Sequence, residues 1–379
     1  MKEDRFLLDR ARRRLGSLTV YAGPTHSGKT RKLEAEVDRA RRQGRAVQAL
    51  EPTEDALKKI DPATELVVLD DLQAAPDTMI PLLDQLATDQ RLEVVTAGWE
   101  LDHAGRPVGP LPELLCRADV AIKLDDGVCA QPGCRNLASR TQRMLSSDGA
   151  GIRFLPVCRR HHAPEGRLAF QQGWFDEPAG VLELITGCMF SGKSQELIRR
   201  LDQERYAGAA VQVFKPAIDD RDGLEVVASH RKVTLPAIPI TDGAGLAASL
   251  ENATRVVAID EVQFLPADII PRLEALAGSG RHVIAAGLDL DFAGRPFGPM
   301  PELLALADRL TKLQASCQYP GCGSRQATRT QRLNDGVPAS PDAPQVLIGG
   351  SSTYEARCRH HHELPQNHSS TRLPSGLGS

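Results

Sequence analysis

The stretch "GPTHSGKTRKL", Gly23 to Leu33, returns later in the chain as "GCMFSGKSQEL", Gly187 to Leu197. Both copies fit the pattern G-x-x-x-x-G-K-[ST], and each follows a short apolar run, "LTVY" in the first case and "LELI" in the second. Between a strand and a helix, this pattern is typical of a loop whose backbone N–H groups cradle phosphates. The sequence therefore predicts two phosphate-binding loops, each at the start of an α/β unit.

The residues around the second loop follow an alternation of strand and helix patterns. A buried strand is expected at 182–185, and Leu197, Ile198 and Leu201 recur at helical spacing within a helix expected at 194–206. Further β-rich runs follow at 211–214, 256–259 and 283–286. Strands that alternate with helices in this way predict an α/β fold with a mainly parallel sheet of the P-loop NTPase type.

The landmarks of the second half repeat those of the first in the same order. "AGWELDHAGRPVGPLPELL" (97–115) lines up with "AGLDLDFAGRPFGPMPELL" (286–304), and "ASRTQR" (138–143) lines up with "ATRTQR" (327–332). This self-similarity predicts a tandem duplication with a divergent first copy. The expected segments are an N-terminal extension at 1–16, a first repeat at 17–163, a linker at 164–180, a second repeat at 181–364 and a disordered tail at 365–379.

Short-spaced cysteines and histidines also occur once in each half. "CAQPGC" and "CQYPGC" each separate two cysteines by a Pro-Gly turn, and a Cys-x-x-His pair follows later in both halves. Four such ligands close a tetrahedron around zinc, so the spacing predicts one structural zinc ion per repeat, the alternative being reduced, buried thiols. The expected ligands are Cys129, Cys134, Cys158 and His161 in the first repeat and Cys317, Cys322, Cys358 and His361 in the second. Because His360 and His362 flank His361, spacing alone leaves the histidine ligand of the second site open.

The composition limits the classes of protein to consider. The net charge is −3, aromatic residues make up 4% of the chain, and no apolar run approaches the length of about 18 residues that a membrane span needs. The N-terminus "MKEDR" mixes charges and is not followed by the apolar core of a signal peptide. We therefore expect a cytoplasmic protein with no membrane or nucleic-acid partner.

The second loop and a later acidic pair carry chemistry that phosphate transfer needs. Lys193 is expected to reach the β- and γ-phosphates of a nucleotide, and the Ser194 hydroxyl to ligate Mg²⁺. The run "VVAIDEVQF" (256–264) is an apolar strand that ends in two carboxylates. Asp260 at its tip would support the magnesium, while Glu261, pointing the other way along the pleat, would be free to act as a base on an acceptor hydroxyl.

Several motifs of the second half together resemble a known family. "CMFSGKSQELIRR", "KPAIDDR", "IDEVQF", "GLDLDFAGRPFGPMPELLALA", "ATRTQR" and "IGGSSTYEARCRHH" occur in the order found in the zinc-containing, bacterial-type (type II) thymidine kinases, which include the cytosolic human enzyme. The resemblance covers Gly180 to about Glu363. It implies transfer of the ATP γ-phosphoryl group to the 5′-hydroxyl of thymidine, with Mg²⁺, in a P-loop domain that carries a zinc-ribbon lasso subdomain.

The resemblance also implies roles for individual residues. Glu261 is the expected catalytic base, with Lys193 as its catalytic partner on the phosphates. The residues expected to bind ATP are Gly187, Cys188, Met189, Phe190, Ser191, Gly192, Lys193 and Ser194, with Asp260, Glu261, Val262 and Gln263. Those expected to contact thymidine are Met189, Leu288, Phe292, Phe297 and Tyr354, with Gln345, Val346, Leu347, Ile348 and Gly349 in a lasso over the base. Asp220, Arg221 and Arg332 are expected near the phosphates and magnesium.

The first copy departs from this pattern at the same positions. Asp71 stands where the second copy has Glu261, and a side chain shorter by about 1 Å can lose about 10²-fold in rate. The loop-to-carboxylate segment is shorter too, and the first copy has nothing like "DDR". Thr25, His26, Val108 and Phe154 replace Met189, Phe190, Phe297 and Tyr354. We expect the first repeat to be structural or regulatory, the alternatives being a kinase for another substrate or a slow thymidine kinase.

Two expectations concern partners. The family forms tetramers, so we expect a homo-oligomer, either a dimer of tandem chains or a tetramer. A P-loop ATPase whose zinc ribbons bind nucleic acid is the alternative function, and it is disfavoured because no basic stripe accompanies the ribbons.

Overall fold

The computed structural model describes residues 15–124, 127–145, 151–163, 179–219, 226–228, 234–345 and 354–365. The expected linker at 164–180 and tail at 365–379 therefore lie almost wholly outside the described residues, as does most of the extension at 1–16. Among the described residues, the helices are all too short or too polar to cross a membrane.

The first half of the chain holds a five-stranded parallel sheet in the order β2-β3-β4-β1-β5. Its elements are β1 (Ser17–Ala22), α2 (Lys29–Arg42), β2 (Val47–Leu50), α3 (Glu54–Leu57), β3 (Leu66–Leu69), η1 (Leu72–Ala74), α4 (Met79–Thr88), β4 (Glu93–Gly98), α5 (Leu111–Arg117) and β5 (Val120–Lys123). An antiparallel pair, β6 (Arg140–Leu145) and β7 (Ile152–Val157), and the short helix η2 (Arg159–His161) complete this half.

The second half repeats the same strand order and adds one strand. Its six-stranded parallel sheet runs β12-β9-β13-β14-β8-β15, so β8, β9, β13, β14 and β15 take the places of β1, β2, β3, β4 and β5. The elements are β8 (Val181–Gly187), α6 (Lys193–Tyr206), β9 (Val211–Pro216), β10 (Val226–Ala228), β11 (Thr234–Pro236), β12 (Ile238–Ile240), α7 (Gly243–Ser249), β13 (Val256–Ile259), η3 (Val262–Phe264), α8 (Ile269–Gly278), β14 (His282–Gly287), α9 (Met300–Leu306) and β15 (Arg309–Leu313). A three-stranded antiparallel sheet follows, with β16 (Ala327–Asn334), β17 (Val337–Pro338), β18 (Tyr354–Cys358) and the short helix η4 (Arg359–His361).

The strands are apolar because helices cover both faces of each sheet. Leu182 and Leu184 of β8 belong to the core on the side of α8 and α9, whereas Ile185 packs with Leu197 and Leu201 of α6 on the other side. Parallel strands that are buried on both faces read as continuous apolar runs, which is the pattern in the sequence. The α/β fold with mainly parallel sheets, and the expected strands and helix around the second loop, are therefore confirmed.

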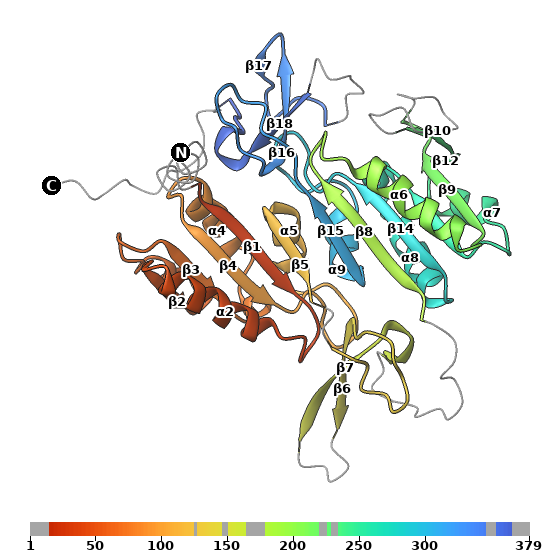
Figure 1. Cartoon of the computed structure of the whole chain (residues 1–379), viewed down its shortest axis with the longest axis horizontal. Coiled ribbons are helices and arrows are strands. Elements are labelled where there is room, and N and C mark those ends of the chain that lie inside the picture. Colours follow the sequence, from red (N-terminus) through yellow and green to blue (C-terminus); the bar gives the residue numbers. More distant parts are fainter. Residues whose placement is uncertain are drawn as a thin grey trace, which may run out of the picture.

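The two halves pack directly against each other. Figure 1 shows the sheets side by side, with β5 and β15 at the facing edges and the small sheets β6–β7 and β16–β18 at opposite ends of the molecule. Leucines of α5 and α9 lie in one continuous core cluster. The side chain of Lys312 in β15 is buried and donates to the carbonyl oxygens of Leu115 and Cys116, at 2.8 and 2.6 Å. Lys123 of β5 donates to the carbonyl oxygens of Ala305 and Ala307. The contacts are thus reciprocal across the interface.

Candidate active site and metal clusters

The second phosphate loop connects the end of β8 to the start of α6. Gly187, Phe190 and Gly192 have positive φ angles of 144°, 65° and 89°, and Phe190 accepts the left-handed conformation although it carries a side chain. A Cβ atom at Gly187 would lie 2.3 Å from the carbonyl oxygen of Leu313, so only glycine fits there. Backbone strain at a non-glycine residue is typical of loops shaped for a ligand.

Polar groups around this loop suit a bound phosphate and metal ion. Lys193 is buried, and its Nζ donates to the carbonyl oxygen of Cys188 at 3.0 Å, which folds the ammonium over the loop. The Ser191 hydroxyl oxygen is buried and makes no hydrogen bond with any described residue. The Ser194 side chain lies beside Asp260 and acts to lower the pKa of its carboxyl group. A cradle, a cation and a hydroxyl–carboxylate pair are the groups that a phosphate with Mg²⁺ requires.

Asp260 and Glu261 follow β13, but they do not alternate along its pleat as the sequence led us to expect. The strand ends at Ile259, and Glu261 lies in the left-handed region at φ 51°, where it precedes the short helix η3. The backbone N–H of Glu261 donates to Asp260 Oδ1 at 3.0 Å. A tight turn, not the pleat, therefore places the two carboxylates.

The proximity of the two carboxylates affects how Asp260 titrates. Burial raises the pKa of Asp260 to about 7, and the neighbouring Glu261 carboxylate acts in the same direction. The Ser194 side chain and the charge of Lys193 oppose this rise. Asp260 is therefore poised to gain or lose its charge near neutral pH, and a divalent cation beside it would favour the charged form.

Gln263 connects the acidic turn to the apolar end of β14. Its Nε2 donates to Glu261 Oε2 at 2.5 Å, and its Oε1 accepts from the backbone N–H of Leu288 at 3.0 Å. The Leu288 side chain is buried, whereas the fully buried Val262 packs in the core rather than toward the loop. The amide of Gln263 thus fixes the Glu261 carboxylate relative to residues expected to contact the acceptor.

The residues expected to form the thymine cage are brought together in part. Met189, Phe292 and Tyr354 belong to one apolar cluster, although they come from three distant segments. Phe297 is also buried, and its ring contacts that of Phe264 in an edge-on arrangement with centroids 5.4 Å apart. Leu288 and Phe297 lie outside that cluster.

The expected lasso falls mostly outside the described residues. Val346, Leu347, Ile348 and Gly349, like Asp220 and Arg221, are not described. Gln345 at the start of the lasso donates from Nε2 to Asp291 Oδ2 at 3.0 Å. Arg332, expected near the phosphates, places its guanidinium 3.7 Å from the centroid of the Phe292 ring and donates to the carbonyl oxygen of Pro344.

The first half carries a loop of the same shape. Gly23, His26 and Gly28 have φ angles of 153°, 58° and 84°, close to those of the second loop. Lys29 Nζ donates to the carbonyl oxygens of Gly23 and Pro24, at 2.8 and 2.7 Å, and burial lowers its pKa. Phosphate-loop geometry is therefore retained in this half.

The acidic turn of the first half makes corresponding hydrogen bonds, but an aspartate, Asp71, stands in place of the longer Glu261. Thr30 Oγ1 donates to Asp70 Oδ2 at 2.8 Å, and Gln73 Nε2 donates to Asp71 Oδ1 at 3.1 Å. The backbone N–H of Trp99 donates to Gln73 Oε1 at 3.0 Å. The Trp99 ring meets the Phe154 ring edge-on with centroids 5.5 Å apart, so an aromatic pair stands where the second half has Leu288 and Tyr354.

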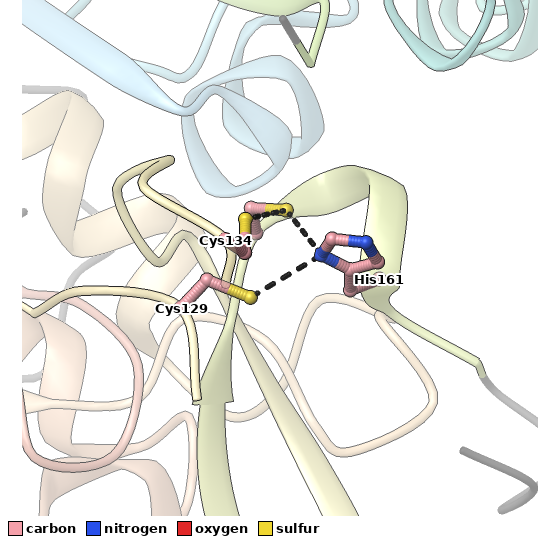
Figure 2. Close-up of side chains that lie close together, drawn as sticks. Cys129, Cys134 and His161 are labelled. Carbon is pink, nitrogen blue, oxygen red and sulfur yellow. Dashed lines mark hydrogen bonds between the residues drawn. The ribbon is translucent and has the colours of Figure 1, made fainter. Parts of the chain in front are cut away.

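Each half also brings three cysteines and one histidine together. In the first half the ligand atoms are those of Cys129, Cys134, Cys158 and His161. Figure 2 shows the side chains of Cys129, Cys134 and His161 converging. Cys134 and Cys158 Sγ are 4.0 Å apart, and His161 Nδ1 is 3.4 Å from Cys129 Sγ. Tetrahedral zinc with Zn–S bonds of about 2.3 Å separates its sulfurs by about 3.8 Å. The cluster therefore fits a closed, structural zinc site.

The second cluster has the same composition and resolves which histidine belongs to it. Cys317, Cys322, Cys358 and His361 converge, with Cys322 and Cys358 Sγ 3.9 Å apart and His361 Nδ1 3.1 Å from Cys358 Sγ. His360 Nε2 instead lies 3.0 Å from the carbonyl oxygen of Gly16, and His362 Nε2 lies 2.8 Å from that of Phe292. His361 is therefore the histidine of the cluster.

One contact at the site was not predicted from the sequence. Thr330 Oγ1 of β16 accepts from the backbone N–H of Met189 at 3.0 Å, and so joins the small sheet to the phosphate loop. Thr141 Oγ1 of β6 does the same for Thr25 at 2.9 Å in the first half. Both threonines belong to the "TQR" motif that the two halves share, so this repeat was the sequence feature that could have indicated their common role.

A comparison with protein-family models concerns the second half of the chain. The thymidine kinase family model matches residues 180–362. The matched residues include the second phosphate loop, the acidic turn, the apolar cluster around Phe292 and the second cysteine–histidine cluster. They do not include the first phosphate loop, so the tandem duplication remains an inference from the sequence and from the shared strand order. Residues 180–362 therefore belong to the thymidine kinase family.

Proposed function

We propose that the second half of the chain transfers the γ-phosphoryl group of ATP to the 5′-hydroxyl of thymidine, with Mg²⁺, to give thymidine monophosphate. The observation that carries the proposal is the position of Glu261 between two neighbours. Asp260 and the neighbouring Ser194 lie on the phosphate side, and Gln263 links Glu261 to Leu288, a residue expected to contact thymidine, on the other. A base with a phosphate loop on one side and apolar side chains on the other suits transfer to a nucleoside hydroxyl.

The side chains divide the work as follows. The N–H groups of the loop and the Lys193 ammonium bind the phosphate oxygens and orient the γ-phosphorus toward the acceptor. Ser194 and Asp260 would hold Mg²⁺, which neutralises phosphate charge when bound. Glu261 accepts the proton of the 5′-hydroxyl, and Gln263 fixes the orientation of its carboxylate. Met189, Phe292 and Tyr354 exclude water around the base.

The zinc ions are proposed to be structural. Three sulfurs and one nitrogen fill a tetrahedron in each cluster, and these clusters close the ends of the small antiparallel sheets. In the second half the cluster lies at the end of β18, and Cys188 of the phosphate loop packs in the same apolar group as Cys317 and Cys358. The metal thus supports the loop without taking part in the reaction. Thiolate ligands that must stay reduced agree with a cytoplasmic location.

For the first half we propose a structural or regulatory role without nucleoside phosphorylation. Asp71 is shorter than Glu261, and the Trp99–Phe154 pair occupies the place of the cage. We further propose that chains associate as homo-oligomers; a native mass equal to one chain would contradict this.

The test is phosphoryl transfer from radiolabelled ATP to thymidine, with 5′-deoxythymidine as the matched acceptor that lacks the reacting hydroxyl. We expect thymidine monophosphate from the first acceptor, no labelled product from the second, and loss of the reaction when magnesium is chelated. Absence of transfer to thymidine, combined with retention of oligonucleotides on the protein, would favour the alternative of a nucleic-acid-binding ATPase.

A further inference from the structure

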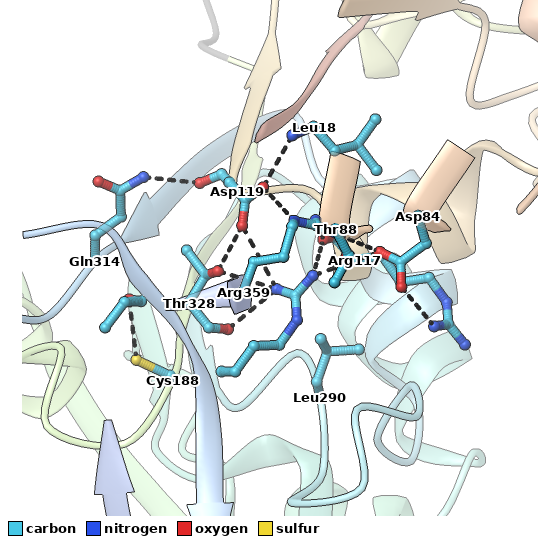
Figure 3. A network of polar contacts seen from close by, with 12 residues as sticks. Leu18, Asp84, Thr88, Arg117, Asp119, Cys188, Leu290, Gln314, Thr328 and Arg359 are labelled. Carbon is cyan, nitrogen blue, oxygen red and sulfur yellow. Dashed lines mark hydrogen bonds and ion pairs between the residues drawn. The ribbon is translucent and has the colours of Figure 1, made fainter. Parts of the chain in front are cut away.

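A buried carboxylate of the first half binds the small sheet of the second half. Asp119 directly precedes β5, and its hydrogen-bond and ion-pair partners among the described residues include none of those assigned to the reaction. Its Oδ2 accepts from Arg359 Nε at 2.7 Å, and its Oδ1 accepts from Thr328 Oγ1 at 2.7 Å. Gln314 Nε2 donates to the backbone oxygen of Asp119 at 2.9 Å. Figure 3 shows these side chains meeting at the junction of the halves.

Two guanidinium groups of the second half are buried in this junction. Arg329 and Arg359 both donate to the carbonyl oxygen of Arg117, at 2.7 and 2.8 Å, and both pair with Asp84 of α4. Burial raises the pKa of Asp119, but Arg359 and Arg329 outweigh it and lower that pKa to about 2. The side chains of Asp119, Arg329 and Arg359 are at most 7% exposed, so loss of one partner leaves a buried charge uncompensated.

The elements of the second half that Asp119 contacts, β16 and η4, also support the candidate active site. Thr328 and Arg329 lie in β16, which also carries Thr330 and Arg332. Thr330 holds the backbone of Met189 in the phosphate loop, and Arg332 covers the Phe292 ring. Arg359 follows the cluster residue Cys358, so its anchor also fixes the end of β18.

We propose that Asp119, a residue of the first half, is a positioning residue for the active site of the second half. It holds β16 and η4 in register with the phosphate loop and the apolar cage. This assigns the first half a task in catalysis that does not depend on its own phosphate loop. The inference rests on the proposed thymidine phosphorylation only for its kinetic readout.

The chain contains a matched control for this network. Asp308 directly precedes β15 and pairs with Arg140 and Arg159, which belong to β6 and η2 of the first half. Glu274 of α8 takes the place of Asp84. Asp308 also accepts from the backbone N–H of Leu182 at 2.8 Å, as Asp119 does from Leu18 at 2.9 Å. The side chain of Asp308 is 10% exposed, against 7% for Asp119, but Asp308 anchors the small sheet of the first half.

The experiment compares the full-length variants Asp119→Asn and Asp308→Asn. A protein that merely loses folded fraction shows a lower kcat with unchanged KM values, so KM is the informative constant. We expect Asp119→Asn to raise KM for thymidine by about 10-fold, whereas Asp308→Asn stays within about twofold of wild type. Hydrogen–deuterium exchange should increase in β16 and η4 for Asp119→Asn, and in β6, β7 and η2 for Asp308→Asn.

Thr328→Val provides a milder variant, since it removes one hydrogen bond to Asp119 and leaves all charges in place. It should give a smaller rise in the same KM. Equal KM values in both aspartate variants, or faster exchange in Asp119→Asn that leaves β16 unaffected, would overturn the proposal. If wild type fails to phosphorylate thymidine, the proposed function is wrong, and the exchange comparison alone decides whether Asp119 anchors the small sheet.

Discussion

The hydrogen bond from the Met189 N–H to Thr330 links the small sheet directly to the phosphate loop. Thr330→Val keeps the shape of the side chain and removes the acceptor. The bond is partly buried, and a donor left without a partner away from water costs up to about 1–3 kcal/mol. The adjacent Phe190 already holds a left-handed backbone, so the loop is expected to relax when this bond is lost. ATP must then restore the loop, and its affinity should fall by about 5- to 150-fold.

The assay is KM for ATP in thymidine phosphorylation, together with the melting temperature. Thr141→Val is the matched control, because Thr141 makes the same bond to the first loop and is equally buried, at 2% exposed against 3% for Thr330. Both variants should lower the melting temperature by a few degrees, at about 2–4 °C per kcal/mol. Only Thr330→Val should raise KM for ATP. The same rise in both variants, or in neither, would refute the reasoning.

Two further predictions concern charge and metal. Because burial and Glu261 raise the pKa of Asp260 to about 7, ionisation of Asp260 should destabilise the magnesium-free protein progressively as pH rises from about 4 to about 7. Asp260→Asn should therefore flatten the fall in melting temperature over this range, and an unchanged slope would show that the carboxylate ionises freely in the fold. Wild type should bind two zinc ions per chain, and Cys129→Ser and Cys317→Ser should each bind one, as measured by elemental analysis. Unchanged zinc content in either variant would contradict the assigned ligand sets.

The strands, the helix after the second loop and both metal clusters could be predicted from local patterns. Leu197, Ile198 and Leu201 recur at helical spacing because one face of α6 must cover the sheet. The cysteine pairs flank Pro-Gly turns, which bring both sulfurs to one ion regardless of the rest of the fold. These signals lie within a few residues of each other, which is why the sequence alone contains them.

What could not be predicted depends on contacts between distant segments. The pleat alternation expected for Glu261 was wrong, because the strand ends at Ile259 and Glu261 itself adopts a left-handed turn conformation. The choice of His361 over its neighbours became clear only when His360 and His362 were seen to bond carbonyl oxygens elsewhere. No local sequence pattern indicates Asp119, because its partners Thr328 and Arg359 are more than 200 residues away.

Whether catalysis resides in the second half alone is best decided by comparing two carboxylate variants. Phosphoryl transfer to thymidine should be measured at saturating ATP and thymidine for wild type, Glu261→Gln and Asp71→Asn. We predict that Glu261→Gln loses about 10²-fold or more of the rate, the usual contribution of a general base, and that Asp71→Asn retains the wild-type rate. A comparable loss in Asp71→Asn, or substantial turnover in Glu261→Gln, would contradict the assignment of the reaction to the second half.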